Sequence, residues 1–207
     1  TVLGVFRQTY TPLDQVDASR SPCWIALEQV RDPGNLGTII RTADSAGCGG
    51  VILIGDCVDP FSVEAVRATM GSVFAVPLVR ATETEFLNWS KKASALVVGS
   101  HLKGSVDYRT IGYKDQPVVL LMGNEQQGLP DTLATTCGKL ARIPQTGRAE
   151  AIARFRVRPE REIGAALLDQ TRVAGIGTMY AAESLFLRRV SPWTTVAELT
   201  TDQLWSV

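Results

Sequence analysis

A segment in the middle of the chain has the composition of a ligand-binding loop. The residues from Leu121 to Pro130 read LMGNEQQGLP, an apolar strand that runs into polar residues flanked by Gly123 and Gly128. Such a loop offers backbone N–H and C=O groups at the carboxyl end of a strand, where open α/β sheets bind ligands. It contains no lysine and does not match the phosphate-binding pattern Gly-x-x-x-x-Gly-Lys. The segment therefore favours a ligand without a polyphosphate, such as adenine or adenosine bound by backbone groups.

A second group of polar residues follows a turn at residues 32–35. Asn35 is a candidate N-cap for a helix that runs to Ala46, and Gly47 is placed to end it. An apolar stripe at helical spacing contains Leu36, Ile39, Ile40 and Ala43. Arg41 lies off that stripe, so it projects from the first two turns toward the ends of the strands. The alternative is a solvated helix arginine, with Asn35 as a cap only.

Short β-branched runs alternate with amphipathic stretches, which predicts an α/β fold with a mostly parallel sheet. The expected strands are residues 24–27, 51–55, 74–79, 95–99, 117–122 and 140–143, with helices between them. This order brings the loop after residue 122 and the helix after residue 32 to the carboxyl ends of strands.

Composition excludes several classes of protein. The 207 residues include 21 Lys+Arg and 21 Asp+Glu, so binding of nucleic acid by bulk charge is excluded and any such contact must use a local patch. Apolar runs such as residues 51–54 are far shorter than the roughly 20 residues of a membrane span. The four cysteines form no Cys-x-x-Cys pair and there is one histidine, so no metal site is expected. Together with the absence of a signal-peptide pattern, this indicates a cytoplasmic protein.

Two motifs in order resemble the SpoU branch of the SPOUT RNA methyltransferases over about residues 3–150. Residues 35–43 (NLGTIIRTA) match the first family motif, residues 121–130 the second, and residues 142–144 the start of the third. Residues 67–72 and 99–105 are also similar to the family. The resemblance implies a SPOUT-type trefoil knot, a homodimer, S-adenosylmethionine as methyl donor and a ribose 2′-hydroxyl of ribosomal or transfer RNA as acceptor.

The resemblance also implies residue roles. Arg41 would be the catalytic arginine and would contact RNA, with Asn35 and Glu125 organising it. Because a guanidinium holds its proton far above neutral pH, orientation of a phosphate suits Arg41 better than proton abstraction. His101 fits a loop residue with satisfied hydrogen bonds better than a proton carrier. The implied cofactor-binding residues are Leu102, Gly123, Asn124, Glu125, Gly128, Ile143, Pro144 and Ile152.

The third motif departs from the family pattern. After Ile-Pro the family continues into Ser-Leu-Asn, whereas this chain reads Ala151-Ile152-Ala153. The apolar middle residue is kept, but a hydroxyl and an amide are replaced by methyl groups. Each lost hydrogen bond to a buried partner would cost about 1–3 kcal/mol. Cofactor binding is therefore expected to survive better than methyl transfer.

The last part of the chain resembles a different family. Residues 163–170 and 178–187 are helical in pattern, and Gly175 and Gly177 allow a sharp double turn between them. Over about residues 151–207 this is similar to the helix-two-turns-helix module of the formamidopyrimidine-DNA glycosylase and endonuclease VIII family. The resemblance implies weak DNA binding through Gly175, Gly177 and Thr178, where backbone N–H groups meet a phosphate. The family often has asparagine at the position of Thr178. The arginines at 154, 156, 158 and 161 are either a solvated stretch or a nucleic-acid contact.

The two resemblances predict a methyltransferase domain at residues 1–150 and a small all-α segment at 151–207. They meet without a Gly/Ser/Pro linker, which indicates a composite chain produced by engineering, by recombination or by an error in the sequence. Three functions stay open: an RNA ribose methyltransferase, a non-catalytic nucleic-acid-binding protein, and a DNA glycosylase fragment without its N-terminal proline nucleophile.

Overall fold

The chain forms two compact units, residues 1–143 and 144–207. The computed structural model describes residues 5–101, 104, 106–124, 127–144, 147–169, 171–172 and 177–207, and does not describe the side chain of Met179. The boundary predicted between residues 150 and 151 falls inside a helix of the second unit, α5 (Arg148–Arg156).

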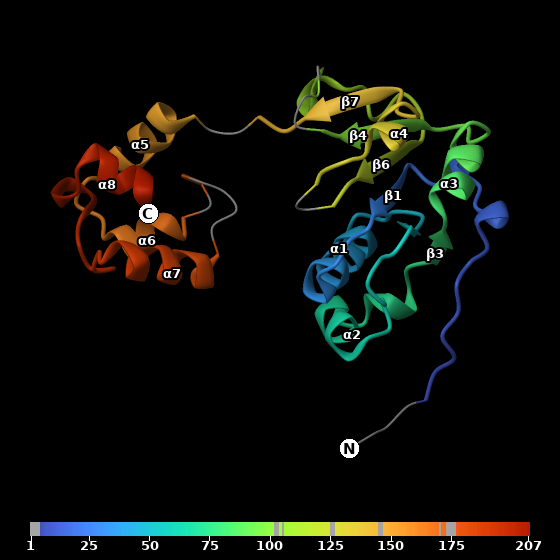
Figure 1. Cartoon of the computed structure of the whole chain (residues 1–207), viewed down its shortest axis with the longest axis horizontal. Coiled ribbons are helices and arrows are strands. Elements are labelled where there is room, and N and C mark those ends of the chain that lie inside the picture. Colours follow the sequence, from blue (N-terminus) through green and yellow to red (C-terminus); the bar gives the residue numbers. More distant parts are fainter. Residues whose placement is uncertain are drawn as a thin grey trace. The chain divides into compact units, whose positions relative to one another are not determined.

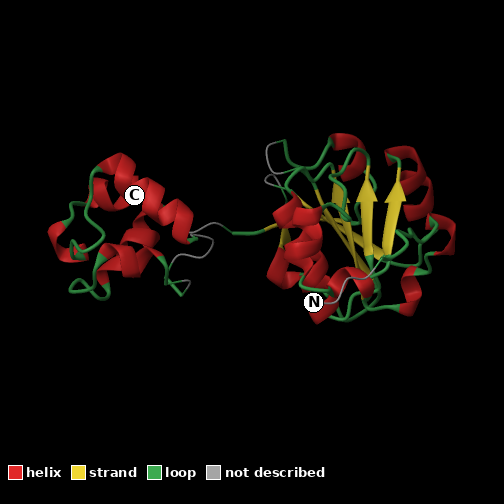
Figure 2. Cartoon of the chain, turned by 90° about the horizontal axis from the view of Figure 1, so that it is seen from below, coloured by secondary structure: helices red, strands yellow, loops and turns green. Residues whose placement is uncertain are grey.

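A seven-stranded sheet organises the first unit, in the order β3-β2-β1-β6-β4-β7-β5, and every described strand pair is parallel. The strands are β1 (Cys23–Glu28), β2 (Val51–Ile54), β3 (Leu78–Ala81), β4 (Leu96–Ser100), β5 (Val106–Asp107), β6 (Val118–Met122) and β7 (Lys139–Arg142). The predicted α/β class with a parallel sheet is confirmed, and Figure 2 shows helices around this sheet. The trefoil knot stays a prediction.

The described residues of the first unit also form four α-helices and four 3-10 helices, of which the first two 3-10 helices precede β1. The α-helices are α1 (Pro33–Ser45), α2 (Val63–Thr69), α3 (Glu83–Ser90) and α4 (Asp131–Ala134), and the 3-10 helices are η1 (Leu13–Gln15), η2 (Ala18–Arg20), η3 (Ser72–Phe74) and η4 (Tyr108–Thr110), all within the described residues. Figure 1 shows α1 and α2 beside each other, and α3 near β3. The strand predicted at residues 74–79 is wrong in position. Phe74 ends η3 with 64% of its surface exposed, and β3 begins only after Pro77.

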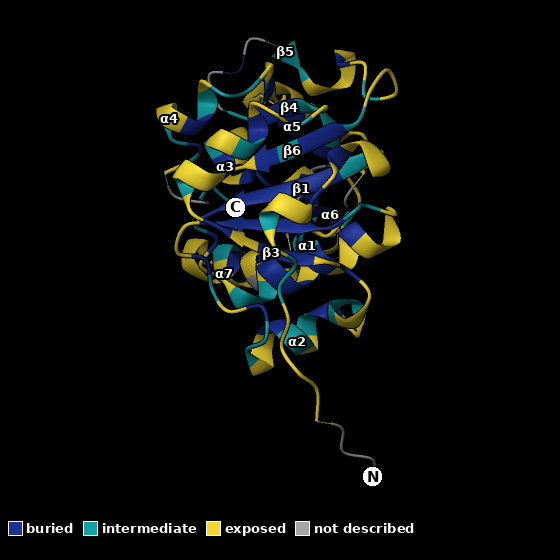
Figure 3. Cartoon of the chain, turned by 90° about the vertical axis from the view of Figure 1, so that its right-hand side faces the viewer, coloured by how far each residue is buried: buried dark blue, intermediate teal, exposed yellow. Residues whose placement is uncertain are grey.

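Strand β1, which lies inside the sheet between β2 and β6, is buried on both faces, as Figure 3 shows. Trp24 and Ala26 pack in one apolar cluster with Phe86 of α3, whereas Ile25 and Leu27 pack in another with α1. Alternation of side chains along a strand explains this division. The buried sheet therefore presents the ends of its strands, rather than its faces, to a ligand.

Helix α1 starts differently from the prediction. Its N-cap is Asp32, whose carboxylate accepts a hydrogen bond from the Asn35 N–H at 2.5 Å. Asn35 is therefore not the N-cap. Pro33 takes the first helical position, where its missing N–H costs nothing, so the cap falls on the preceding residue. Gly47 follows the last turn with φ +66°, in agreement with its predicted role of ending the helix.

The second unit is helical in its described residues (Figure 2). It contains α5, α6 (Ile163–Leu167), α7 (Thr178–Arg188), η5 (Val196–Glu198) and α8 (Thr201–Ser206). Its core includes Phe155, Ile163, Leu167, Leu185 and Leu204, each at most 6% exposed. The predicted start of a helix at Thr178 is confirmed.

No helix in the described ranges has both the length and the apolar character to cross a membrane.

Candidate active site at the carboxyl edge of the sheet

Four adjacent strands end at one edge of the first unit. They lie in the order β1-β6-β4-β7, and parallel pairing brings their carboxyl ends together. The chain leaves β1 toward α1, β6 at Gly123, β4 at His101 and β7 at Ile143. The described parts of the three predicted family motifs thus each follow a strand that ends at this edge, which is where ligands bind to α/β sheets.

The loop after β6 is closed by its two glycines. The Gly128 N–H donates to the Asn124 carbonyl at 2.8 Å. A Cβ on Gly123 would lie 2.3 Å from the carbonyl carbon and oxygen of Gly128, so no other residue fits there. Gly128 has φ +72° and open space where a Cβ would lie. Gly123 is thus required by close contact, and Gly128 by its backbone conformation.

Asn124 ties this loop to the end of β1. Its side-chain N–H donates to the Gln29 carbonyl at 2.8 Å, and its side-chain oxygen accepts from the Gln127 N–H at 3.3 Å. Glu28, the last residue of β1, is buried at only 5% exposure. Glu28 is not among the predicted site residues. The signal for it in the sequence is an acidic residue at the end of an apolar strand.

Apolar side chains are exposed beside the loop. Met122 at the end of β6 is 39% exposed, and Ile143 after β7 is 57% exposed. Strand β4 lies between β6 and β7. Directly after β4, the His101 N–H donates to the Ala141 carbonyl at 2.9 Å, which holds this part of the chain against β7. The predicted residues Leu102 and Glu125 lie outside the described residues. Exposed apolar groups next to loop backbone suit a ligand such as adenosine.

Helix α1 carries the other predicted residues. Asn35 lies in its first turn and Arg41 about 9 Å further along the axis, and both are exposed. Gly37, one turn before Arg41, packs directly on α2, where a Cβ would lie 2.5 Å from the Ala65 carbonyl oxygen. The close helix contact fixes the helix that carries Arg41.

The remaining predicted residues belong to the second unit. Pro144 is its first residue and is exposed, whereas Ile152 is buried in its core. Gly175 lies outside the described residues. Gly177 is the N-cap of α7 and Thr178 its first residue, and both are exposed, with no side-chain hydrogen bond capping that end.

Most arginines of the predicted basic stretch bond within the second unit. Arg154 pairs with Glu150 at 2.6 Å and donates to the Arg172 carbonyl at 3.2 Å. Arg156 donates to the Leu199 carbonyl at 3.3 Å. Arg161 pairs with Asp169 at 2.5 Å. These contacts give the stretch a structural role.

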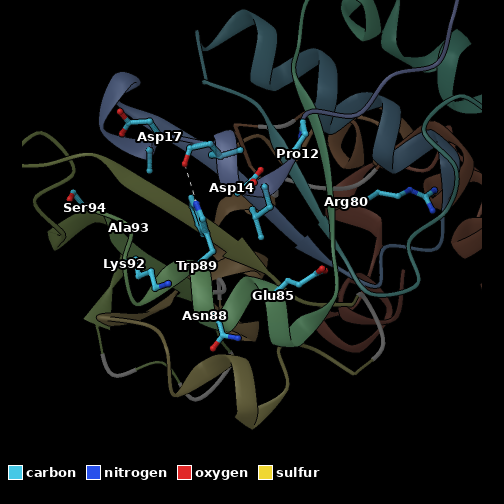
Figure 4. Close-up of a pocket in the computed structure, with 13 residues that line it drawn as sticks. Pro12, Asp14, Asp17, Arg80, Glu85, Asn88, Trp89, Lys92, Ala93 and Ser94 are labelled. Carbon is cyan, nitrogen blue, oxygen red and sulfur yellow. Dashed lines mark hydrogen bonds between the residues drawn. The ribbon is translucent and has the colours of Figure 1, made fainter.

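A cavity of about 920 Å³ lies elsewhere in the first unit. It lies beside Pro12–Ala18 and α3, where the Trp89 indole N–H donates to the Val16 carbonyl at 3.1 Å (Figure 4). Its lining includes Asp14, Arg80 and Lys92, side chains of both signs, and none of the described candidate residues. Among the described residues, no group of three His, Cys, Asp or Glu side chains could hold a metal ion.

Two known families match this chain, one over its first part and one over its last part. The pattern of the SpoU rRNA Methylase family covers residues 22–152, more than half of the chain. The chain belongs to this family. The pattern of the formamidopyrimidine-DNA glycosylase H2TH domain, the helix-two-turns-helix module, covers residues 143–207. Both predicted resemblances are confirmed, and the two patterns overlap at the junction.

Relatives of this SpoU family chain support the assignment. It is 31% identical over 157 residues to a 23S rRNA (uridine(2479)-2'-O)-methyltransferase of Streptomyces viridochromogenes, covering 73% of this chain and 54% of the relative. It is 33% identical over 128 residues to the 23S rRNA (guanosine(2553)-2'-O)-methyltransferase RlmP of Bacillus subtilis, covering 62% and 51%. The crystal structure of an AdoMet-bound rRNA methyltransferase from Sinorhizobium meliloti is 61% identical, with TM-score 0.67, covering 70% of this chain and 55% of that one. The chain thus spans about half the length of the curated relatives it matches.

Proposed function

We propose that this chain binds S-adenosylmethionine and transfers its methyl group to a ribose 2′-hydroxyl of ribosomal or transfer RNA. The proposal rests on the arrangement at one edge of the sheet in this member of the SpoU family. There the Gly123–Gly128 loop, the end of β7 and the start of α1 follow adjacent strands. The relatives named as 23S rRNA 2'-O-methyltransferases support the same reaction.

The residues present fit the proposed cofactor. Gly123 and Gly128 have no side chain beyond hydrogen, so a ligand such as adenosine can approach their backbone, and Met122 and Ile143 offer exposed apolar surface. We propose that Gly123, Asn124, Gly128, Ile143 and Pro144 line this site. Leu102 and Glu125 are further candidates from the sequence. S-adenosylmethionine, when bound, supplies the activated methyl group.

We propose that Arg41 binds the RNA phosphate next to the target ribose. A guanidinium forms paired hydrogen bonds to phosphate oxygens, and such a contact fixes the 2′-oxygen in line with the methyl group. Asn35, in the first turn of the same helix, and Glu125 would organise this contact. Arg41 is exposed, so it is accessible to an RNA strand.

The changed third motif is expected to affect methyl transfer more than cofactor binding. Ala151 and Ala153 replace the serine and asparagine of the family, and Ile152 between them packs in the second unit. The proposed cofactor site therefore depends on the loop after β6 and the end of β7. A non-catalytic nucleic-acid-binding protein is the alternative function.

Calorimetric titration with S-adenosylmethionine, combined with transfer of a labelled methyl group to a 23S rRNA transcript, tests the proposal. We expect micromolar binding, and we expect Arg41→Ala to keep cofactor affinity within about twofold while reducing transfer by about 100-fold or more. Binding without transfer by the wild-type chain would favour the non-catalytic alternative. Absence of binding would remove the cofactor assignment.

A second function is favoured by the H2TH match at residues 143–207. We propose that the start of α7 binds DNA phosphates weakly, because Gly177 and Thr178 are exposed at a helix end without a side-chain cap. We also propose that the protein acts as a homodimer in the cytoplasm. A glycosylase fragment is a distant third function, because no counterpart of the family's nucleophile domain is found in this sequence.

A further inference from the structure

A second cavity of the first unit, of about 540 Å³, lies beside the start of β3. One side is formed by the N-terminal arm, residues 5–12, and the other by residues 73–78, from η3 to the start of β3. The Thr11 N–H donates to the Leu78 carbonyl at 2.8 Å, which holds the arm against β3. Since the strands are parallel, the start of β3 lies at the amino edge of the sheet, opposite the edge of the candidate active site. The volume is within the range of pockets that bind small ligands.

Two phenylalanines that line this cavity are exposed although they contact each other. The ring centroids of Phe6 and Phe74 lie 4.7 Å apart, and the ring planes are tilted by 47°. Phe6 is 67% exposed and Phe74 is 64% exposed, so most of the surface of each residue stays open to a ligand. A flat aromatic ligand that stacks on these rings would remove apolar surface from water.

The turn after α2 holds Phe74 in this position. Met70 has φ +51° and Gly71 has φ +102°, so two successive left-handed residues end α2 and begin η3. The Phe74 N–H then donates to the Gly71 carbonyl at 3.1 Å. Helix α1, which carries Arg41, contacts both α2 and η3. The helix of the proposed RNA contact and the segment that carries Phe74 are therefore packed together.

The charge on the lining has one sign. Among the described residues that line the cavity, Arg7 is charged and none is an aspartate or glutamate. Arg7 is exposed, and within the described part of the chain it has no ion-pair partner. The side chains of Gln8, Thr9 and Thr11 can donate and accept hydrogen bonds. Aromatic rings, a cation and polar groups together suit a ligand with a flat base and a phosphate, which is a nucleotide.

We propose that this cavity binds a nucleotide of single-stranded RNA outside the target ribose, with its base stacked on Phe74 and Phe6 and its phosphate beside Arg7. The inference rests on the proposed function, because it assigns a second contact to the same RNA substrate. An unpaired nucleotide is required, since a base within a duplex is already stacked on its neighbours. Helix α1 links the two contacts through its packing on η3.

Fluorescence anisotropy of the full chain with a labelled oligouridylate of about 12 nucleotides tests the stacking. We expect Phe74→Ala and Phe6→Ala each to weaken binding by about fivefold or more, because each removes a stacking ring. Phe74→Tyr keeps the ring and should bind within about twofold of wild type. Met70→Ala is the matched control. Met70 is 77% exposed in the neighbouring turn and is not part of the lining, so its loss should change affinity by less than about twofold.

Two further measurements separate stacking from attraction by charge. The duplex of the same oligouridylate with oligoadenylate presents no free base, so Phe74→Ala should leave its affinity unchanged. Arg7→Ala should weaken binding of the single strand and reduce the slope of log affinity against log salt concentration by about 0.7, the value for one phosphate contact in a single strand.

Several outcomes would overturn the inference. One is equal single-strand affinity of wild type and folded Phe74→Ala, and another is an equal loss of affinity in Met70→Ala. A lower sedimentation mass of Phe74→Ala would identify this face as a contact between copies of the chain and would also overturn it.

Titration with S-adenosylmethionine keeps this test separate from the proposed function, because Phe74→Ala should bind the cofactor as wild type does. A chain that transfers methyl groups but is insensitive to Phe74→Ala loses this inference alone. A chain that binds no cofactor loses the proposed function, and the anisotropy measurements still decide whether the cavity binds RNA.

Discussion

At the scale of single residues, the two glycines of the loop after β6 have different physical roles that the sequence alone could not separate. Both are visible as glycines flanking polar residues. Only the structure shows that Gly123 approaches the Gly128 backbone while Gly128 needs positive φ. The sequence also could not show that Asp32, rather than Asn35, caps α1, or that Glu28 is buried. Both properties depend on contacts between atoms.

This difference predicts unequal effects of the two alanine variants. Gly123→Ala places a Cβ 2.3 Å from Gly128, so the loop must open and cofactor affinity should fall by about tenfold or more. Gly128→Ala meets no atom within 4 Å and costs about 1 kcal/mol for its left-handed backbone, so its loss should be smaller. Thermal unfolding first confirms that both variants are folded. Calorimetric titration with S-adenosylmethionine then measures the affinity of each variant. A larger loss of cofactor affinity in Gly128→Ala than in Gly123→Ala would contradict the roles assigned to the two glycines.

At the scale of elements, segments with a clear apolar pattern were predictable, and segments without one were not. The stripe of Leu36, Ile40 and Ala43 identified α1, and apolar runs identified β1, β2 and β6. The two-residue strand β5 is too short to leave a pattern. The strand predicted at 74–79 began too early because Phe74 and Val76 are apolar, although Phe74 ends η3 and β3 starts after Pro77.

Helix α7 supports a prediction about DNA. If its exposed N-terminus binds phosphate, Gly177→Val should weaken binding to duplex DNA more than Arg154→Ala, since Arg154 already bonds to Glu150 and the Arg172 carbonyl. The valine fits, because no atom lies within 4 Å of the added Cβ. Fluorescence anisotropy at two salt concentrations should show weaker binding at high salt. Arg158 is exposed, so Arg158→Ala is a control for the loss of one positive charge. Equal DNA affinity of wild type and Gly177→Val would show that the start of α7 does not contact DNA.

At the scale of the whole molecule, the two units have separate hydrophobic cores, so we expect a substitution in one unit to lower the stability of that unit. Asp169 connects parts of the second unit, accepting hydrogen bonds from Thr171 and Arg161. The Thr171 hydroxyl and N–H, followed by Arg161, lower the pKa of Asp169 to about 2. Since the pKa is lowered by folding, this stabilisation is complete above the usual aspartate range and disappears as pH falls toward 2.

Asp169→Asn should therefore lower the melting temperature of the second unit at pH 7, with a difference that shrinks as pH falls from 4 toward 2. Asp202→Asn is the matched control. Asp202 pairs with Arg148 at the surface with 90% of its side chain exposed, so its loss should change little. Calorimetric unfolding across this pH range measures both variants. A constant difference between Asp169→Asn and wild type would contradict the role of the charge.

The place of β1 in the sheet has a consequence for synthesis on the ribosome. Its partner β2 follows within the next 30 residues, but its other partner β6 pairs Cys23 with Val118. Until β6 has left the exit tunnel, one edge of the largely buried strand β1 stays open to other chains. Sheets built from such distant partners fold slowly, because a long loop must close before the pairing is formed. The nascent chain should therefore bind chaperones from the emergence of β1 until the emergence of β6, and a translational pause after β6 has emerged should favour productive folding.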